Sequence, residues 1–230
     1  MIERTEGSGP HAGQPVLTRG APFGTARAAL IMLHGRNAGP ENILGLAEPL
    51  DHPAYAYIAP AAAQGTWYPL SFMQPRVANE PFLASALEVV QRLIEQVTRQ
   101  GIARERILLL GFSQGACLAL ETGYLTARRE ENQMASFPVG GIIGFSGGLI
   151  GAPGTRWSAT GSFAGRPVFL GCSDVDAHIP RSRVEETATV FERLGADVTL
   201  RLYPGMGHLV NDDELSVARS MMDRVAQGAG

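Results

Sequence analysis

The most informative segment of this chain reads Ile107-Leu108-Leu109-Leu110-Gly111-Phe112-Ser113-Gln114-Gly115, followed by Ala116-Cys117-Leu118-Ala119-Leu120. A short apolar run closed by glycine is typical of a strand that is buried on both faces. The second apolar run predicts a helix that begins directly after Ser113. Glycines two positions before and after Ser113 permit a tight turn, because larger side chains there would collide with neighbouring backbone. A strand, a sharp turn and a helix form the context in which G-x-S-x-G exposes a nucleophilic serine.

The same motif occurs a second time, as Gly144-Phe145-Ser146-Gly147-Gly148. This copy also follows a predicted strand, but Gly151, Pro153 and Gly154 come soon after it, and such a sequence does not support a helix. We therefore expect Ser113 to be the nucleophile and Ser146 to be a turn residue at the end of a strand.

Outward from Ser113, strands and helices alternate along the whole chain. Strands are predicted over 28–33, 54–59, 107–112, 139–145, 167–171 and 198–203, and helices over 80–100, 114–126, 181–194 and 212–227. This alternation predicts an α/β fold with a mainly parallel, doubly wound sheet covered by helices on both faces. Residues 28–230 are expected to form a single domain. Residues 1–27 are expected to form an N-terminal lead-in with an edge hairpin around Gln14–Arg19, and His11 would lie in this loose segment.

Composition excludes several functional classes. Of the 230 residues 45% are hydrophobic, as in globular proteins, and the net charge of −3 offers no basic surface for nucleic acid. No apolar run approaches the ~20 residues of a membrane span, and the first thirty residues do not resemble a signal peptide. Cys117 and Cys172 cannot form a metal cluster or a disulfide framework. We expect a cytoplasmic protein that needs no metal and no organic cofactor and does not insert stably into a membrane.

A serine nucleophile needs a base, in the chain order Ser, Asp, His. Only His178 and His208 follow Ser113, and His208 lies between the last predicted strand and the last predicted helix, where a loop can reach the carboxyl edge of the sheet. His178 is the weaker candidate. Asp174 and Asp176 both follow the strand 167–171, and either could orient an imidazole. Asp176 is favoured for that role, with Asp174 as a helix cap or a residue that supports the triad.

Two backbone N–H groups should stabilise the oxyanion, one directly after the nucleophile and one from the loop after an early strand. The first is that of Gln114. The second belongs to His34-Gly35-Arg36-Asn37-Ala38-Gly39, where Arg36 is favoured over Asn37, and His34 is expected to be a structural hydrogen-bonding residue. Apolar pocket walls are expected from Trp67, Tyr68, Leu70, Phe72 and Met206, although ordinary core packing would use the same residue types.

These residues resemble the α/β-hydrolase fold and, more narrowly, the phospholipase/carboxylesterase family, which includes acyl-protein thioesterases and small bacterial carboxylesterases. The resemblance lies in Leu33-His34-Gly35, Thr66-Trp67-Tyr68-Pro69, Gly111–Gly115, Asp176 four residues before Pro180, and Gly205-Met206-Gly207-His208. It implies Ser113, Asp176 and His208 as the triad and the amides of Arg36 and Gln114 as the oxyanion hole. The short interval between Ser146 and Pro167 leaves no room for a large cap domain.

The family resemblance implies a serine carboxylesterase that hydrolyses short- to medium-chain esters through an acyl-enzyme, with a small-molecule ester as its partner. Three alternatives remain open. One is an acyl-protein thioesterase or lysophospholipase, and another is an enzyme like dienelactone hydrolase, which would need a cysteine where Ser113 stands. The third is an inactive hydrolase fold that serves as a ligand receptor. The physiological ester and the oligomeric state also remain open.

Overall fold

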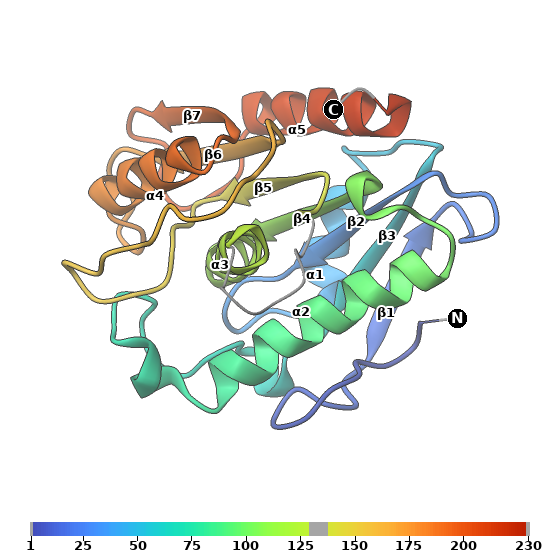
Figure 1. The fold of residues 1–230 in the computed structure, drawn as a ribbon, viewed down its shortest axis with the longest axis horizontal. Helices are drawn as coiled ribbons and strands as arrows, with labels where there is room; N and C mark the ends of the chain where they lie inside the picture. The colour runs from blue at the N-terminus through green and yellow to red at the C-terminus, as the bar shows by residue number, and fades with distance from the viewer. Residues whose placement is uncertain (1, 129–137, 229–230) are drawn as a thin grey trace.

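A computed structural model describes residues 2–128 and 138–228, and one seven-stranded sheet forms its centre (Figure 1). The strands lie in the order β1-β3-β2-β4-β5-β6-β7, and β1 is antiparallel to β3 whereas all other neighbours are parallel. The strand bounds are β1 Val16–Gly20, β2 Ala28–Leu33, β3 Tyr55–Pro60, β4 Ile107–Phe112, β5 Gly141–Phe145, β6 Pro167–Ser173 and β7 Asp197–Tyr203. The expected α/β fold is confirmed.

In the part of the chain that the structure describes, five α-helices cover the two faces of the sheet. They are α1 Pro40–Leu44, α2 Phe82–Arg99, α3 Gln114–Ala127, α4 Arg181–Arg193 and α5 Asp212–Gln227, with 3-10 turns at Gly45–Ala47, Ala63–Gly65, Arg76–Asn79 and Arg104–Arg106. Helices α2, α3 and α4 share one apolar core with the sheet, and α1 and α5 share the other. In Figure 1 the sheet runs from β1 at the lower right to β7 at the upper left, and α2 crosses in front of it.

Strand β2 explains why these strands are apolar without interruption. Ala29, Ile31 and Leu33 pack in the core with α2 and α3, and the alternate residues of the strand pack in the core with α1 and α5. All six residues of the strand are fully buried. A strand between two layers of helices has no solvent-facing side, so both sets of alternate residues have to be apolar.

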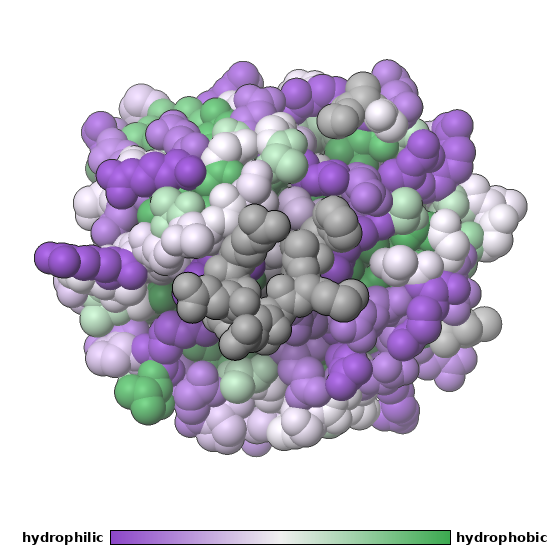
Figure 2. All heavy atoms as spheres, viewed as in Figure 1, coloured by the Kyte–Doolittle hydropathy of each residue, from purple (hydrophilic) through white to green (hydrophobic). Residues whose placement is uncertain are grey.

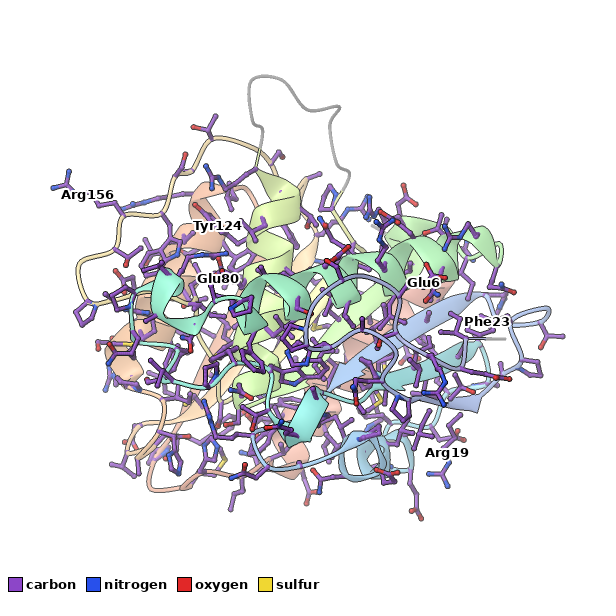
Figure 3. All side chains as sticks on the ribbon, turned by 90° about the horizontal axis from the view of Figure 1, so that it is seen from below. Glu6, Arg19, Phe23, Glu80, Tyr124 and Arg156 are labelled. Carbon is purple, nitrogen blue, oxygen red and sulfur yellow. The ribbon has the colours of Figure 1, made fainter. Side chains whose placement is uncertain are left out.

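The N-terminal segment packs on the body of the molecule. The side chain of Glu88 on α2 accepts hydrogen bonds from Ser8, and Glu6 pairs with Arg99 at the end of the same helix. Figure 3 shows Glu6 beside α2. The hairpin expected around Gln14–Arg19 is only partly formed, since one antiparallel bridge joins Arg4 to Pro15 while β1 pairs with β3 as the edge strand.

The segment between β5 and β6 contains no helix, so the chain carries no large cap there, as expected. Figure 2 shows that hydrophilic residues cover most of the visible face, with apolar side chains in small separate patches. Among the described helices, none combines the length and the apolar character required to cross a bilayer.

Candidate active site

Ser113 occupies a strained turn between β4 and α3. Its backbone has φ 56° and ψ −119°, a conformation that L-residues rarely adopt. A Cβ added to Gly111 would overlap the backbone of Gly115, and one added to Gly115 would overlap the carbonyl group of Leu33. Both glycines of the motif are therefore required by close contact between backbone segments.

His208 reaches Ser113 from the loop between β7 and α5. Its Nε2 lies 2.9 Å from Oγ of Ser113, and its Nδ1 lies 2.7 Å from Oδ2 of Asp176. Phe112, which directly precedes the serine, packs on the imidazole with ring centroids 4.8 Å apart. The structure thus brings together the three side chains that the sequence predicts to act as a unit.

Both carboxylate oxygens of Asp176 accept hydrogen bonds. Burial would by itself raise its pKa, but the hydrogen bond from His208 and the backbone N–H groups of His178 and Ile179 outweigh that effect and lower the pKa. The side chain is fully shielded from solvent. Asp176 is therefore an ionised acceptor at neutral pH.

Asp174 supports the loop that carries His208. Its Oδ1 accepts the backbone N–H of Gly205 at 2.8 Å, and Oγ of Ser173 accepts that of Gly207 at 3.1 Å. The N-cap of α4 is Pro180, and no side chain caps that helix. The sequence-based option that Asp174 caps the helix is wrong, because its side chain turns toward the 205–208 loop instead.

The other candidate serine and histidine have different surroundings. Ser146 is fully buried at the end of β5, with φ 51°, and does not line the cavity beside Ser113. His178 is exposed, lines that cavity, and packs its ring edge-on against His208 with centroids 4.8 Å apart. The imidazole that bonds to the side chains of Ser113 and Asp176 is that of His208, whereas His178 reaches Asp176 only through its backbone N–H.

The backbone N–H groups of the loop after β2 differ in whether they already have a hydrogen-bond partner. The N–H of Asn37 donates to the carbonyl of Gly65 at 2.8 Å, and that of Ala38 donates to Gly35 at 3.3 Å. In the described part of the chain, no hydrogen bond uses the backbone N–H of Arg36 or of Gln114, and both residues line the cavity. Asn37 is therefore occupied, whereas Arg36 and Gln114 have N–H groups available for an oxyanion.

A cavity of about 530 Å³ opens over Ser113. Of the predicted wall residues, Tyr68, Leu70 and Phe72 line it, but Trp67 and Met206 do not. Trp67 is fully buried and donates its indole N–H to the carbonyl of His34 at 2.9 Å. The sulfur of Met206 accepts a hydrogen bond from the Asn211 amide instead. The cavity is also lined by residues that the sequence analysis did not assign to its walls, namely Asn42, Pro69, Ser71, Phe112, Cys117, His178 and Ile179.

A family model described as Phospholipase/Carboxylesterase matches residues 21–225. The chain belongs to the phospholipase/carboxylesterase family. A solved phospholipase/carboxylesterase from Dyadobacter fermentans is 37% identical, with a TM-score of 0.82 over 91% of this chain and 96% of that one. Zea mays acyl-protein thioesterase 2, at 18% identity, has a TM-score of 0.71 over 93% of this chain and 99% of that one, and shares the fold.

Curated relatives include acyl-protein thioesterase 1 of Eremothecium gossypii, which is 32% identical over 149 residues. That match covers 60% of this chain and 57% of the relative. The protein of the same name from Saccharomyces cerevisiae is 27% identical over 170 residues, covering 71% and 70%. The chain thus spans little more than half the length of the first of these relatives.

In this member of the phospholipase/carboxylesterase family, Arg183 packs against Phe72, which lines the cavity. Its side chain is 2% exposed and donates to the carbonyls of Leu149 and Gly151 at 2.8 Å each. The N–H of Gly151 in turn donates to the carbonyl of Phe72 at 2.9 Å. Nothing in the local sequence distinguishes Arg183 from the exposed arginines of the same helix.

The two cysteines of this family member are buried. Burial raises the pKa of Cys117 to about 11 and that of Cys172 to about 12, so both are thiols at neutral pH. Cys117, one helical turn after Ser113, is therefore no competing nucleophile. Within residues 2–128 and 138–228, no three His, Cys, Asp or Glu side chains are grouped as metal ligands.

Proposed function

We propose that this chain is a serine carboxylesterase that hydrolyses short- to medium-chain carboxylic esters through an acyl-enzyme. The observation that carries the proposal is the continuous hydrogen-bonded chain from Oγ of Ser113 through both ring nitrogens of His208 to Asp176. Membership of the phospholipase/carboxylesterase family supports the same reaction class.

The tautomer of His208 follows from its partners. A carboxylate can only accept, so Nδ1 of His208 carries the hydrogen that meets Asp176, and Nε2 presents its lone pair to Ser113. His208 removes the proton as Oγ attacks the ester carbonyl. The negative charge then develops on the carbonyl oxygen, within reach of the N–H groups of Arg36 and Gln114.

Collapse of this intermediate expels the alcohol, which takes its proton from His208 and leaves the acyl group on Ser113. A water molecule then gives a proton to His208 and attacks the acyl-enzyme in the same way. The second collapse releases the carboxylic acid and returns the proton to Ser113. Asp176 remains ionised throughout and holds the imidazole in orientation.

Thioester hydrolysis is the second candidate, because the curated relatives are named acyl-protein thioesterase 1. The first step would be identical, with a thiol as the leaving group. A series of acyl chain lengths, offered both as 4-nitrophenyl esters and as thioesters, separates the two. We expect the oxygen esters of short and medium length to give the higher kcat/KM, and a maximum on long-chain thioesters would reverse that assignment.

The two copies of G-x-S-x-G provide a matched test. Ser113→Ala should lower turnover of 4-nitrophenyl butyrate by at least about 10⁴-fold, as loss of a triad nucleophile does, and should abolish labelling by a fluorophosphonate. Ser146→Ala should keep both properties, because that hydroxyl is buried and outside the cavity. Turnover retained by Ser113→Ala, or a wild-type protein that no fluorophosphonate labels, would refute the proposal.

A further inference from the structure

We propose that the side chain of Arg36 is a positioning residue for the oxyanion hole, acting through the segment Trp67–Leu70. The inference rests on the proposed function, because it concerns the two residues whose backbone N–H groups would hold the oxyanion. Both residues fasten their side chains to the main chain of this same four-residue segment.

Gln114 makes the first half of this connection. Its Oε1 accepts the backbone N–H of Trp67 at 2.9 Å, and its Nε2 donates to the carbonyl of Tyr68 at 2.7 Å. The Gln114 residue is 5% exposed, so these bonds lie in an interior where a lost partner is costly. They lock the first residue of α3, directly after Ser113, against Trp67–Leu70.

The guanidinium group of Arg36 forms the second set of hydrogen bonds to Trp67–Leu70. Its Nη1 donates to the carbonyl of Pro69 at 2.8 Å, and its Nη2 donates to those of Tyr68 and Leu70 at 3.0 and 2.7 Å. The carbonyl of Tyr68 thus receives Arg36 and Gln114 together. Among the described residues, no carboxylate pairs with Arg36. Its donors are therefore used to fix backbone geometry, which a planar guanidinium does well.

The segment Trp67–Leu70 is itself anchored at both ends. The indole N–H of Trp67 donates to the carbonyl of His34, and its own carbonyl accepts from Nε2 of His11 at 2.8 Å. At the other end, the N–H of Leu70 donates to Oδ1 of Asn79 at 2.8 Å. A segment held in this way can serve as a rigid frame for the loop that it contacts.

Arg36 needs such a frame because its backbone belongs to neither a helix nor a strand. An oxyanion donor is effective only when it is oriented before the charge develops. Loss of the Arg36 fork should therefore weaken transition-state binding much more than substrate binding. The charge of Arg36 should matter less than its ability to reach three carbonyls.

The test uses Arg36→Met, which keeps the stem of the side chain, and Arg36→Lys, which keeps the charge but loses the planar fork. Arg92→Met, on the exposed face of α2, is the matched control. The measurements are kcat and KM on 4-nitrophenyl butyrate and the Ki of an alkyl trifluoromethyl ketone. Oγ of Ser113 adds to that ketone and its proton passes to His208, so the adduct carries the oxyanion.

For Arg36→Met we expect kcat to fall about 10²-fold, the loss typical of one oxyanion donor, with KM nearly unchanged and Ki raised in parallel. Arg36→Lys should stay at least about tenfold below wild type, because a single ammonium cannot replace the fork. Arg92→Met should match wild type. Gln114→Glu keeps Oε1 but loses the donor to Tyr68. Like Arg36→Met, it should lower kcat and raise Ki.

Thermal unfolding identifies variants that fail to fold. If Arg36→Met does not fold, the inference is tested with Arg36→Lys and Gln114→Glu. The inference is overturned if Arg36→Met keeps wild-type kcat, if Arg36→Lys restores it fully, or if KM rises while kcat stays constant. A failure of the proposed function looks different, because wild-type turnover would then be absent or would survive Ser113→Ala.

Discussion

Asp176 lies 2.7 Å from Nδ1 of His208, whereas Asp174, only two residues earlier, points to the backbone N–H of Gly205 at 2.8 Å. One carboxylate faces the imidazole and the other holds the loop that presents it. Two neighbouring acids of the same type thus have different tasks, and this difference can be measured.

Asp176→Asn should lower kcat by roughly 10⁴-fold without unfolding the protein, because an amide donor beside Nδ1 favours the wrong imidazole tautomer. Asp174→Asn is the matched control, since its amide oxygen can still accept the N–H of Gly205, and it should stay close to wild type. The check is kcat on 4-nitrophenyl butyrate together with the melting temperature. Similar losses in both variants would show that the two acids act alike.

Glu214 should make stability depend on pH. This side chain is fully buried at the third position of α5, where Oε2 accepts the N–H of Asn211. Its pKa is raised from the ordinary 4.5 to about 7, mainly by burial and also by the charge of Asp213, against the opposing effect of the Asn211 hydrogen bond. Between these two values the folded state binds more protons than the unfolded state, so the free energy of unfolding falls as pH rises.

Glu214→Gln keeps a hydrogen-bond acceptor but cannot titrate. Across that pH window, wild type should lose on the order of 3 kcal/mol relative to this variant. Urea unfolding of both proteins at pH 4.5 and pH 8 gives the difference, in which the other titrating groups cancel. Parallel pH profiles would mean that Glu214 does not titrate in this range.

Substitution of Arg183 should lower the free energy of unfolding much more than substitution of Arg181, which lies on the same helix α4. Arg183→Met leaves the buried carbonyls of Leu149 and Gly151 without their donor and should cost about 2–5 kcal/mol. Arg181→Met removes only an exposed pair with Glu185 and should change stability by less than about 0.5 kcal/mol. Denaturant unfolding measures both, and equal effects would contradict the buried role of Arg183.

Much of the secondary structure could be predicted because its signals are local. Strands 28–33 and 107–112 and the helix over 212–227 have the bounds read from apolar runs and from the acids at the start of that helix. No comparable local signal predicts α1 Pro40–Leu44, because five residues are too few to show a helical period.

The N-terminal histidine shows where local signals fail. The sequence predicts His11 in a loose segment, yet it is fully buried, accepts the N–H of Ala63 on Nδ1, and donates from Nε2 to the carbonyl of Trp67. Its burial lowers its pKa, so it is a neutral structural residue. The partners of its imidazole lie more than fifty positions away, and no pattern within residues 1–27 could reveal them.

The amino-acid sequence by itself determines the order of strands and helices, the mainly parallel sheet and the serine at the strand-to-helix turn. Each of these depends on residues only a few positions apart. Only the tertiary structure decides which aspartate faces His208, that Trp67 is buried and does not line the cavity, and that Arg36 donates to the carbonyls of Tyr68, Pro69 and Leu70. These pairings join loops that are distant in the chain, and only the closure of the whole sheet brings their donors and acceptors within hydrogen-bond distance.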